Sequence, residues 1–315
     1  MNGFRVFVYY NNPNGTEPKT IRSVEGLQKR DYIGVSKDGQ GGGTRMNESV
    51  VIRRAVTRYS DGEVLSGEDD VVTEYPLTIM LNGEEFATLV CSPDHVEDLS
   101  IGFLASEGLL TDYRSLTDLS YDDRTGHVYA EVEDVDEWLK ESGSKRYFTS
   151  CCGKSRQGFV FYNDARTAKP LQSHTVGLTY EDCISMMSAM QQASGLFKVT
   201  GGVHNAALFE QDGTLLLSRS DIGRHNALDK IYGHILRSEL LMDGKALAFS
   251  GRVSSEVLLK AAKMGCEVLL SKSAATDLAI QLAEDLGITI AGFIRNGSLN
   301  VYTHPERITK GDNNF

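Results

Sequence analysis

The chain has 315 residues, 41% of them hydrophobic, and a formal net charge of −11 at pH 7. A chain of this length and composition can bury a full core and suggests about two domains, which argues against wholesale disorder. The negative charge argues against general nucleic-acid binding, and no apolar run approaches the roughly 18 residues of a membrane-spanning helix. Because no signal-peptide core follows Met1, we expect a cytoplasmic protein with neither a nucleic-acid nor a membrane partner.

Residues 1–45 differ from the rest of the chain. They contain seven Lys or Arg residues against four Asp or Glu residues, together with the run Gly41-Gly42-Gly43. We interpret them either as a disordered basic tail or as a stretch that is not normally translated, because consecutive glycine codons resemble a purine-rich ribosome-binding sequence. The sequence leaves the true start open between Met1 and Met46.

The pattern becomes globular from Val50 onward. Residues 50–58 and 75–90 alternate apolar and polar side chains in the manner of strands, with a hairpin turn at Asn82-Gly83. Next, Ser92 as N-cap and Pro93 at the first helical position predict the start of a helix. A further strand is expected over residues 127–133, so we predict a smaller mixed α/β domain over residues 46–141.

A polar linker loop over residues 142–158 separates this domain from a second one, predicted over residues 159–308 and followed by a tail over 309–315. In the second domain, strand and helix signals alternate, which predicts a three-layer α/β arrangement around a largely parallel sheet. The predicted strands are 204–210, 215–219, 246–249, 268–270 and 288–293. The predicted helices are 180–194, 224–237, 254–264 and 275–286.

The linker loop contains the adjacent cysteines Cys151 and Cys152. Five cysteines at irregular spacing indicate reduced thiols, not a disulfide framework. Lys154 and Arg156 stand beside the pair, and nearby positive charge favours the reactive thiolate. Both cysteines are therefore candidate nucleophiles, although an incidental pair of small residues is the alternative. The remaining cysteines stand in apolar contexts typical of core packing: Cys91, Cys183 and Cys266.

Cationic loops containing glycine or serine follow or precede several predicted strands. These loops contain His204, Arg224, His225, Arg252 and Arg295. Any one of them is compatible with a purely structural turn. Because ligands of such sheets bind at the carboxyl ends of the strands, the loops together predict a pocket for a polyanion such as a diphosphate.

Several motifs stand in a fixed order along the chain. They are Cys91-Ser92-Pro93-Asp94-His95, Gly102-Phe103-Leu104, the cysteine loop, Gly201-Gly202-Val203-His204, Asp221-Ile222-Gly223-Arg224-His225-Asn226-Ala227-Leu228-Asp229-Lys230, Ser250-Gly251-Arg252, and Gly292-Phe293-Ile294-Arg295 with Asn300 to Arg307. Together they resemble the formate dehydrogenase accessory sulfurtransferase family, FdhD, from about Asn47 to Ile308. The resemblance implies that the second domain is similar in fold to cytidine deaminases.

The resemblance also implies a function, that of a sulfur carrier required for formate dehydrogenase activity. It would take sulfur from a cysteine desulfurase as a cysteine persulfide and transfer it to the molybdenum bis(molybdopterin guanine dinucleotide) cofactor, which is bound as cargo before insertion into formate dehydrogenase. GDP would be a partial mimic of that cargo, and the carrier is expected to be a homodimer. The family's cofactor-contacting stretch maps onto Phe293, Ile294, Arg295, Asn296, Gly297 and Ser298.

The sequence departs from the family pattern in the cysteine loop. Many members carry two cysteines two residues apart, whereas this chain has Cys151-Cys152-Gly153 and then Ser155. The carrier is thus left open between the two thiols, with Cys152 favoured because it directly precedes the glycine. A cofactor-binding chaperone without sulfur transfer is the main alternative. A zinc-free relic of a nucleoside deaminase is a further alternative. The His-x-Glu and Pro-Cys-x-x-Cys zinc motifs are absent from the corresponding helix starts, which argues against deamination, so no metal site is expected.

Overall fold

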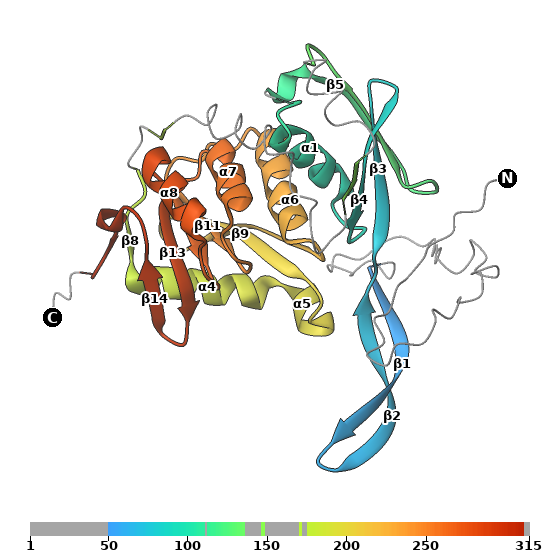
Figure 1. Cartoon of the computed structure of the whole chain (residues 1–315), viewed down its shortest axis with the longest axis horizontal. Helices are drawn as coiled ribbons and strands as arrows, with labels where there is room; N and C mark the ends of the chain where they lie inside the picture. Colours follow the sequence, from blue (N-terminus) through green and yellow to red (C-terminus); the bar gives the residue numbers. More distant parts are fainter. Residues whose placement is uncertain (1–49, 111, 136–145, 149–169, 172–174, 312–315) are drawn as a thin grey trace, which may run out of the picture. The chain divides into compact units, whose positions relative to one another are not determined.

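The computed structural model describes residues 50–110, 112–135, 146–148, 170–171 and 175–311 (Figure 1). Residues 1–45, the end of the tail, and residues 142–145 and 149–158 of the predicted linker, which include Cys151 and Cys152, lie outside the described residues. The remaining linker residues, Arg146–Phe148, form a strand and not a loop. The interpretations of those segments and of the domain boundaries therefore stay predictions. Within the part of the chain that the structure describes, no helix is both long and apolar enough to cross a lipid bilayer.

The described chain begins with a two-stranded antiparallel ribbon. Its strands are β1 (Val51–Ser60) and β2 (Glu63–Val72). The strands are joined by Asp61 and Gly62, both with positive φ, as the tight two-residue hairpin turn requires. The predicted first strand is confirmed, whereas β2, which is rich in acidic residues, was not anticipated.

A five-stranded sheet follows, in the order β5-β6-β3-β4-β7. The hairpin at Asn82-Gly83 is confirmed, with φ values of 49° and 81° at the two turn residues. Pairing is antiparallel between β3 and β4 and parallel between β4 and β7. The strands are β3 (Tyr75–Leu81), β4 (Glu84–Cys91), β5 (Leu116–Asp122), β6 (His127–Val132) and β7 (Arg146–Phe148).

The helix after β4 begins later than predicted. Helix α1 (Val96–Ser106) has His95, in a left-handed conformation, at its N-cap position, so the assignment of Ser92 as N-cap and Pro93 as first helical residue is wrong. The physical reason is tertiary. Both the backbone N–H and the hydroxyl of Ser92 bind the carboxylate of Asp221, 129 residues away, instead of capping a helix.

A six-stranded sheet, in the order β10-β9-β11-β12-β13-β14, forms the centre of the larger α/β unit. The α/β class is confirmed, but the sheet is mixed. The pairs β11–β12 and β12–β13 are parallel, whereas the other three pairs are antiparallel. The strands are β9 (His204–Glu210), β10 (Leu215–Asp221), β11 (Lys245–Phe249), β12 (Val268–Ser271), β13 (Thr289–Arg295) and β14 (Ser298–Val301).

Helices cover both faces of this sheet, as Figure 1 shows. Residues of one face, such as Ala207 and Phe209, pack with the buried methionines of α4 (Tyr180–Ala193). Residues of the other face, such as Ala206 and Leu208, belong to a cluster with the apolar sides of α6 (Arg224–Arg237), α7 (Ser255–Met264) and α8 (Asp277–Leu286). Because side chains alternate along a strand, one sheet supplies both cores, and the predicted three-layer arrangement is confirmed.

Candidate functional site

The predicted cationic loops meet at one edge of the six-stranded sheet. We call this edge, with the loops that contain His204, Arg224, His225, Arg252 and Arg295, the cationic edge. Asp221 at the end of β10 pairs with His204 at the start of β9, which is antiparallel to it. Phe249 at the end of β11 pairs with Ser271 at the end of β12, and the next parallel strand is β13, which ends at Arg295. The sheet register therefore brings these strand ends together, as the sequence predicted.

His204 and Arg224 are neighbours at this edge. The Nδ1 atom of His204 lies 3.5 Å from the hydroxyl oxygen of Ser250. Burial, followed by the positive charge of Arg224, lowers the pKa of His204 below its usual value. A Cβ atom on Gly251 would lie 3.6 Å from the Cβ of Arg224 and only 2.7 Å from the ring of Phe249, so glycine keeps this loop close to α6. The region is thus cationic and favours an anion.

His225 and Arg252 lie near the start of α7. The Nε2 atom of His225 is 3.5 Å from a carboxylate oxygen of Glu256, in the first turn of that helix. Arg252 is exposed and immediately precedes the segment in which Ser254 caps α7, accepting a hydrogen bond from the N–H of Val257. These two predicted site residues therefore stand on the α7 side of the edge, with the side chain of Arg252 accessible to a ligand.

The predicted cofactor-contacting stretch is the turn between β13 and β14. Phe293 has a φ of 54°, a left-handed conformation that is unusual for a bulky residue, and its N–H donates to the carbonyl of Ser273 at 3.0 Å. The guanidinium carbon of Arg295 lies 5.4 Å from the centre of the Phe293 ring. Strained backbone concentrates at functional sites, which singles out this turn within the cationic edge.

The remaining residues of the stretch divide between the surface and the core. Asn296 and Gly297, with φ values of 52° and 73°, form the exposed hairpin turn, and Ser298 is exposed beside them. Ile294, by contrast, is 1% exposed and packs in the core under α4. Ile294 could therefore contact a ligand at this edge only through its backbone, because its side chain is buried.

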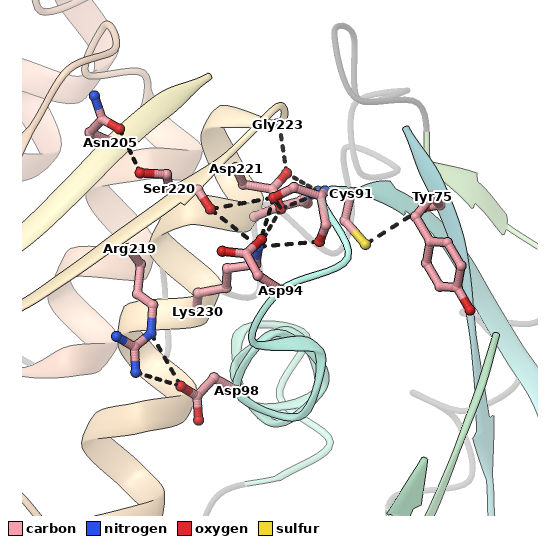
Figure 2. Close-up of polar contacts among 12 residues, drawn as sticks. Tyr75, Cys91, Asp94, Asp98, Asn205, Arg219, Ser220, Asp221, Gly223 and Lys230 are labelled. Atoms are coloured by element: carbon pink, nitrogen blue, oxygen red, sulfur yellow. Dashed lines mark hydrogen bonds and ion pairs between the residues drawn. The ribbon is translucent and has the colours of Figure 1, made fainter. Parts of the chain in front are cut away.

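Sequence reasoning missed a buried polar cluster behind the edge, shown in Figure 2. The ammonium group of Lys230 lies 2.8 Å from Asp221 and 2.9 Å from Asp94, and Lys230 and Asp221 are both fully buried. Ser92 binds both members of the Lys230–Asp221 pair. The available signal was Lys230 itself, because it stands among the apolar residues of its helix and a lysine buried there requires a charged partner.

The cysteines divide as the sequence predicted where they can be located. Cys91, Cys183 and Cys266 are buried and free, and burial raises the pKa of both Cys183 and Cys266 to about 12. Such thiols are poor nucleophiles at neutral pH. Cys151 and Cys152, the candidate carriers, lie outside the described residues.

Comparison with known proteins identifies the family. A family model described as the FdhD/NarQ family matches residues 72–309, most of the chain. The chain belongs to the FdhD/NarQ family. The match includes the five-stranded sheet, the six-stranded sheet and each predicted residue of the cationic edge, so the FdhD resemblance drawn from the sequence is confirmed.

Two similar curated proteins carry the name sulfur carrier protein FdhD. The one from Bacillus subtilis is 52% identical over 263 residues, which cover 84% of this chain and 99% of the relative. The one from Shouchella clausii is 51% identical over 264 residues, covering 84% of this chain and 98% of the relative. A crystal structure of a candidate formate dehydrogenase accessory protein from Desulfotalea psychrophila matches with a TM-score of 0.67. It is 22% identical and covers 82% of this chain and 99% of that protein, which shows the shared fold.

Proposed function

We propose that this protein is a sulfur carrier that supports formate dehydrogenase. The observation that carries the proposal is the identity of about half of all residues with relatives named sulfur carrier protein FdhD, over nearly their whole length. The name of the D. psychrophila neighbour, matched at lower identity, supports the association with formate dehydrogenase. In this proposal the carrier acts in the cytoplasm.

The carrier step in this proposal uses Cys152, or its neighbour Cys151. The cysteine thiolate attacks the outer sulfur of the persulfide on a cysteine desulfurase, forming a new S–S bond and breaking the donor's S–S bond. The desulfurase cysteine leaves as a thiolate, and the carrier now holds a cysteine persulfide. Lys154 and Arg156 would favour the attacking thiolate by their positive charge.

The acceptor in this proposal is the molybdenum bis(molybdopterin guanine dinucleotide) cofactor, bound as cargo. Its diphosphate groups suit the edge that contains Arg224, Arg252 and Arg295, because one guanidinium group can donate two parallel hydrogen bonds to the oxygens of a phosphate. GDP is the smaller ligand that carries the same diphosphate chemistry.

A desulfurase loading experiment tests the sulfur transfer. Incubating the protein with a cysteine desulfurase and cysteine should add about 32 Da, the mass of one sulfur atom, as seen by intact-protein mass spectrometry. Cys152→Ala should abolish the adduct, whereas Cys151→Ala should weaken it only partly. Cys183→Ala is the matched control, because that thiol is buried. An unchanged adduct in the Cys151→Ala, Cys152→Ala double variant would show that neither loop cysteine is the carrier, and dispensable loop cysteines are what a cofactor-binding chaperone predicts.

Size measurement tests the expected homodimer separately. Light scattering coupled to size-exclusion chromatography gives the mass in solution, which should be twice the 34.6 kDa of one chain. The same measurement with GDP present would show whether the ligand changes the state of association. A monomer at all concentrations would remove the homodimer from the proposal and leave the carrier chemistry untouched.

A further inference from the structure

We propose that Lys230 is a positioning residue for the cationic edge. Its buried ammonium group holds the junction between β4 and α1 against the junction between β10 and α6, and it thereby fixes the first turn of α6, where Arg224 stands. The inference rests on the function proposed above, in which the cationic edge binds the anionic cargo. Lys230 itself has no exposed surface and so acts through other residues.

The ammonium group of Lys230 is surrounded by oxygen atoms from both junctions. From the β4–α1 side it reaches Asp94 at 2.9 Å and the hydroxyl of Ser92 at 2.9 Å. From the β10–α6 side it reaches the carboxylate of Asp221 at 2.8 Å and the carbonyl of Ser220 at 3.2 Å. Burial lowers the pKa of Lys230, but the two carboxylates outweigh this and raise it, so the lysine stays charged.

Asp221 transmits this arrangement to the first turn of α6. One of its oxygens accepts from the N–H of Gly223 at 2.7 Å and from the side-chain amide of Asn226 at 2.9 Å. The other oxygen accepts from the N–H and hydroxyl of Ser92 and contacts Lys230. Because Gly223 and Asn226 flank Arg224, the Asp221 carboxylate fixes the backbone that carries this arginine.

The same cluster reaches the start of β9 on the far side of β10. The backbone carbonyl of Ser220 contacts Lys230, and the hydroxyl of Ser220 donates to the side-chain oxygen of Asn205 at 2.8 Å. The N–H of Asn205 donates to the hydroxyl of Ser250, which is the group beside His204. Hydrogen bonds, together with the covalent frames of Ser220 and Asn205, therefore connect Lys230 to Ser250 beside His204.

The other side of the cluster contacts the end of β4, which pairs with the strand that precedes the cysteines in the sequence. Asn226 also donates to the carbonyl of Val90, in the last residues of β4. β4 pairs with β7, where Leu89 is opposite Phe148, and Cys151 follows Phe148 by three residues in the sequence. Lys230 thus stands between the strand pair that precedes the cysteines and the edge assigned to the cargo.

Stability alone is a weak reason for a buried lysine, because burying an ion pair costs desolvation energy and an apolar pair of similar volume is often no less stable. The chain offers a matched comparison on the same helix. Asp229, the preceding residue, forms a second pair with Lys260 of α7, whose side chain is 10% exposed, and accepts from Ser106. That pair joins α6 to α7 and, through Ser106, to α1, so it separates the effect of burying a lysine from the effect of positioning the first turn of α6.

The test compares Lys230→Met with Lys260→Met in the full-length protein. Both variants leave a buried carboxylate without its lysine, so both should lower the melting temperature. Only Lys230→Met should weaken GDP binding, by at least about tenfold, which corresponds to about 1.4 kcal/mol. Sulfur loading by the desulfurase should be the same in both variants, because the thiol chemistry does not use Lys230. A merely structural role would instead reduce loading and GDP binding together.

Amide hydrogen exchange supplies a readout that needs no ligand. The amides of Ser92 and Gly223, both bound to Asp221, should exchange faster in Lys230→Met than in Lys260→Met. If the wild-type protein binds no GDP, the cargo assignment fails, and this comparison still decides the role of Lys230. Equal exchange in the two variants, or a folded Lys230→Met protein with GDP affinity within about twofold of wild type, would overturn the inference.

A milder variant covers the case in which Lys230→Met does not fold. Ser92→Ala removes the hydroxyl that bridges Asp221 and Lys230 while leaving both charges paired with each other. Loss of that hydroxyl should weaken GDP binding by about threefold or more, as expected for one buried hydrogen bond. Ser100→Ala is the control, because its hydroxyl is equally buried and binds only within α1. Equal GDP affinity in the two serine variants would also overturn the inference.

Discussion

Gly102 of α1 and Gly233 of α6 meet where these two helices cross. A Cβ atom built on Gly102 would collide with the carbonyl oxygen of Asp229, and one built on Gly233 would collide with the carbonyl oxygen of Asp98. The obstacles are backbone atoms of well-packed helices, which cannot rotate away as a side chain can. The two glycines therefore set how closely the helix after β4 approaches the helix that begins at the cationic edge.

Gly102→Ala should destabilise the protein severely. Overpacking a dense core typically costs about 1–3 kcal/mol, and we expect the upper end or beyond because the helices must separate. Denaturant unfolding monitored by circular dichroism gives the free energy of unfolding. The control is Gly67→Ala in β2, where an added Cβ atom meets nothing within 4 Å. Equal stability of the two variants would show that the helix crossing is more tolerant than its geometry indicates.

Thiol labelling should separate the two classes of cysteine. Cys91, Cys183 and Cys266 are buried and their thiol pKa values are raised, chiefly by burial, so they should resist iodoacetamide in the native protein and react after unfolding. Peptide mass spectrometry identifies the labelled sites. We expect native-state labelling to be confined to Cys151 and Cys152. Rapid native labelling of Cys266, which is completely buried in the core just before β12, would contradict that burial.

The parts of the fold that follow local rules could be predicted from the sequence. The Asn82-Gly83 turn needs two positive φ values, which these residue types supply, and α6 covers the predicted range of residues 224–237 with its buried residues at helical spacing. The start of α1 could not be predicted in this way. Ser92 has the chemistry of an N-cap, but a buried aspartate far along the chain competes for the same groups.

Strand β2 was missed for a related reason. Its acidic residues Glu68, Asp69 and Asp70 give no apolar alternation, and their partners are arginines of the opposite strand, such as Arg53 with Asp70 at 3.1 Å. Cross-strand pairs stabilise a ribbon without leaving a pattern in either strand alone. The cationic edge could be predicted because ligands of such sheets bind at the carboxyl ends of the strands. The Lys230 cluster, by contrast, depends on contacts between segments that are distant in the sequence, so no local sequence pattern predicts it.

Acidification should destabilise the protein through His234. Burial, followed by the charge of Arg219, lowers the pKa of His234 below its usual 6.5. Its Nδ1 atom accepts from Arg219 at 3.2 Å, in a cluster with Asp98 and Arg237, so a proton on Nδ1 would face a guanidinium donor. The unfolded chain binds this proton more readily, so the contribution of His234 to stability is present above about pH 6.5 and is lost as the pH falls through the folded pKa.

Melting temperatures at pH 7.5, 6.5 and 5.5, compared between wild type and His234→Asn, would measure this contribution. Asparagine offers an acceptor near the position of Nδ1 but does not titrate, so the variant should lose less stability on acidification than wild type. The effects of other titrating groups are common to both proteins and cancel in the comparison. These groups include His204, whose pKa is also lowered, and Asp229, whose pKa is raised by burial. Parallel pH profiles in the two proteins would exclude His234 as a source of acid sensitivity.

Replacing arginines at the cationic edge should lower the affinity for GDP by different amounts. Arg224→Ala and Arg252→Ala each remove a charged donor, and a charge-assisted hydrogen bond to phosphate is worth about 1.5–3 kcal/mol, or roughly ten- to a hundredfold in affinity. We expect the larger loss for Arg224, because it is partly buried beside His204 and Gly251, whereas Arg252 is exposed and more strongly screened by water. Isothermal titration calorimetry gives the dissociation constants.

Arg124→Ala supplies the control for net charge, since that side chain is 83% exposed in the turn between β5 and β6 and pairs only locally with Asp122. Titrations at two salt concentrations separate a specific site from diffuse attraction, because exposed charges are screened within about 10 Å at 0.1 M salt. A specific site should retain the ranking of Arg224 over Arg252 at the higher salt concentration. If Arg124→Ala weakened binding as much as Arg224→Ala, the attraction would come from overall charge, and the assignment of this edge to the diphosphate would be wrong.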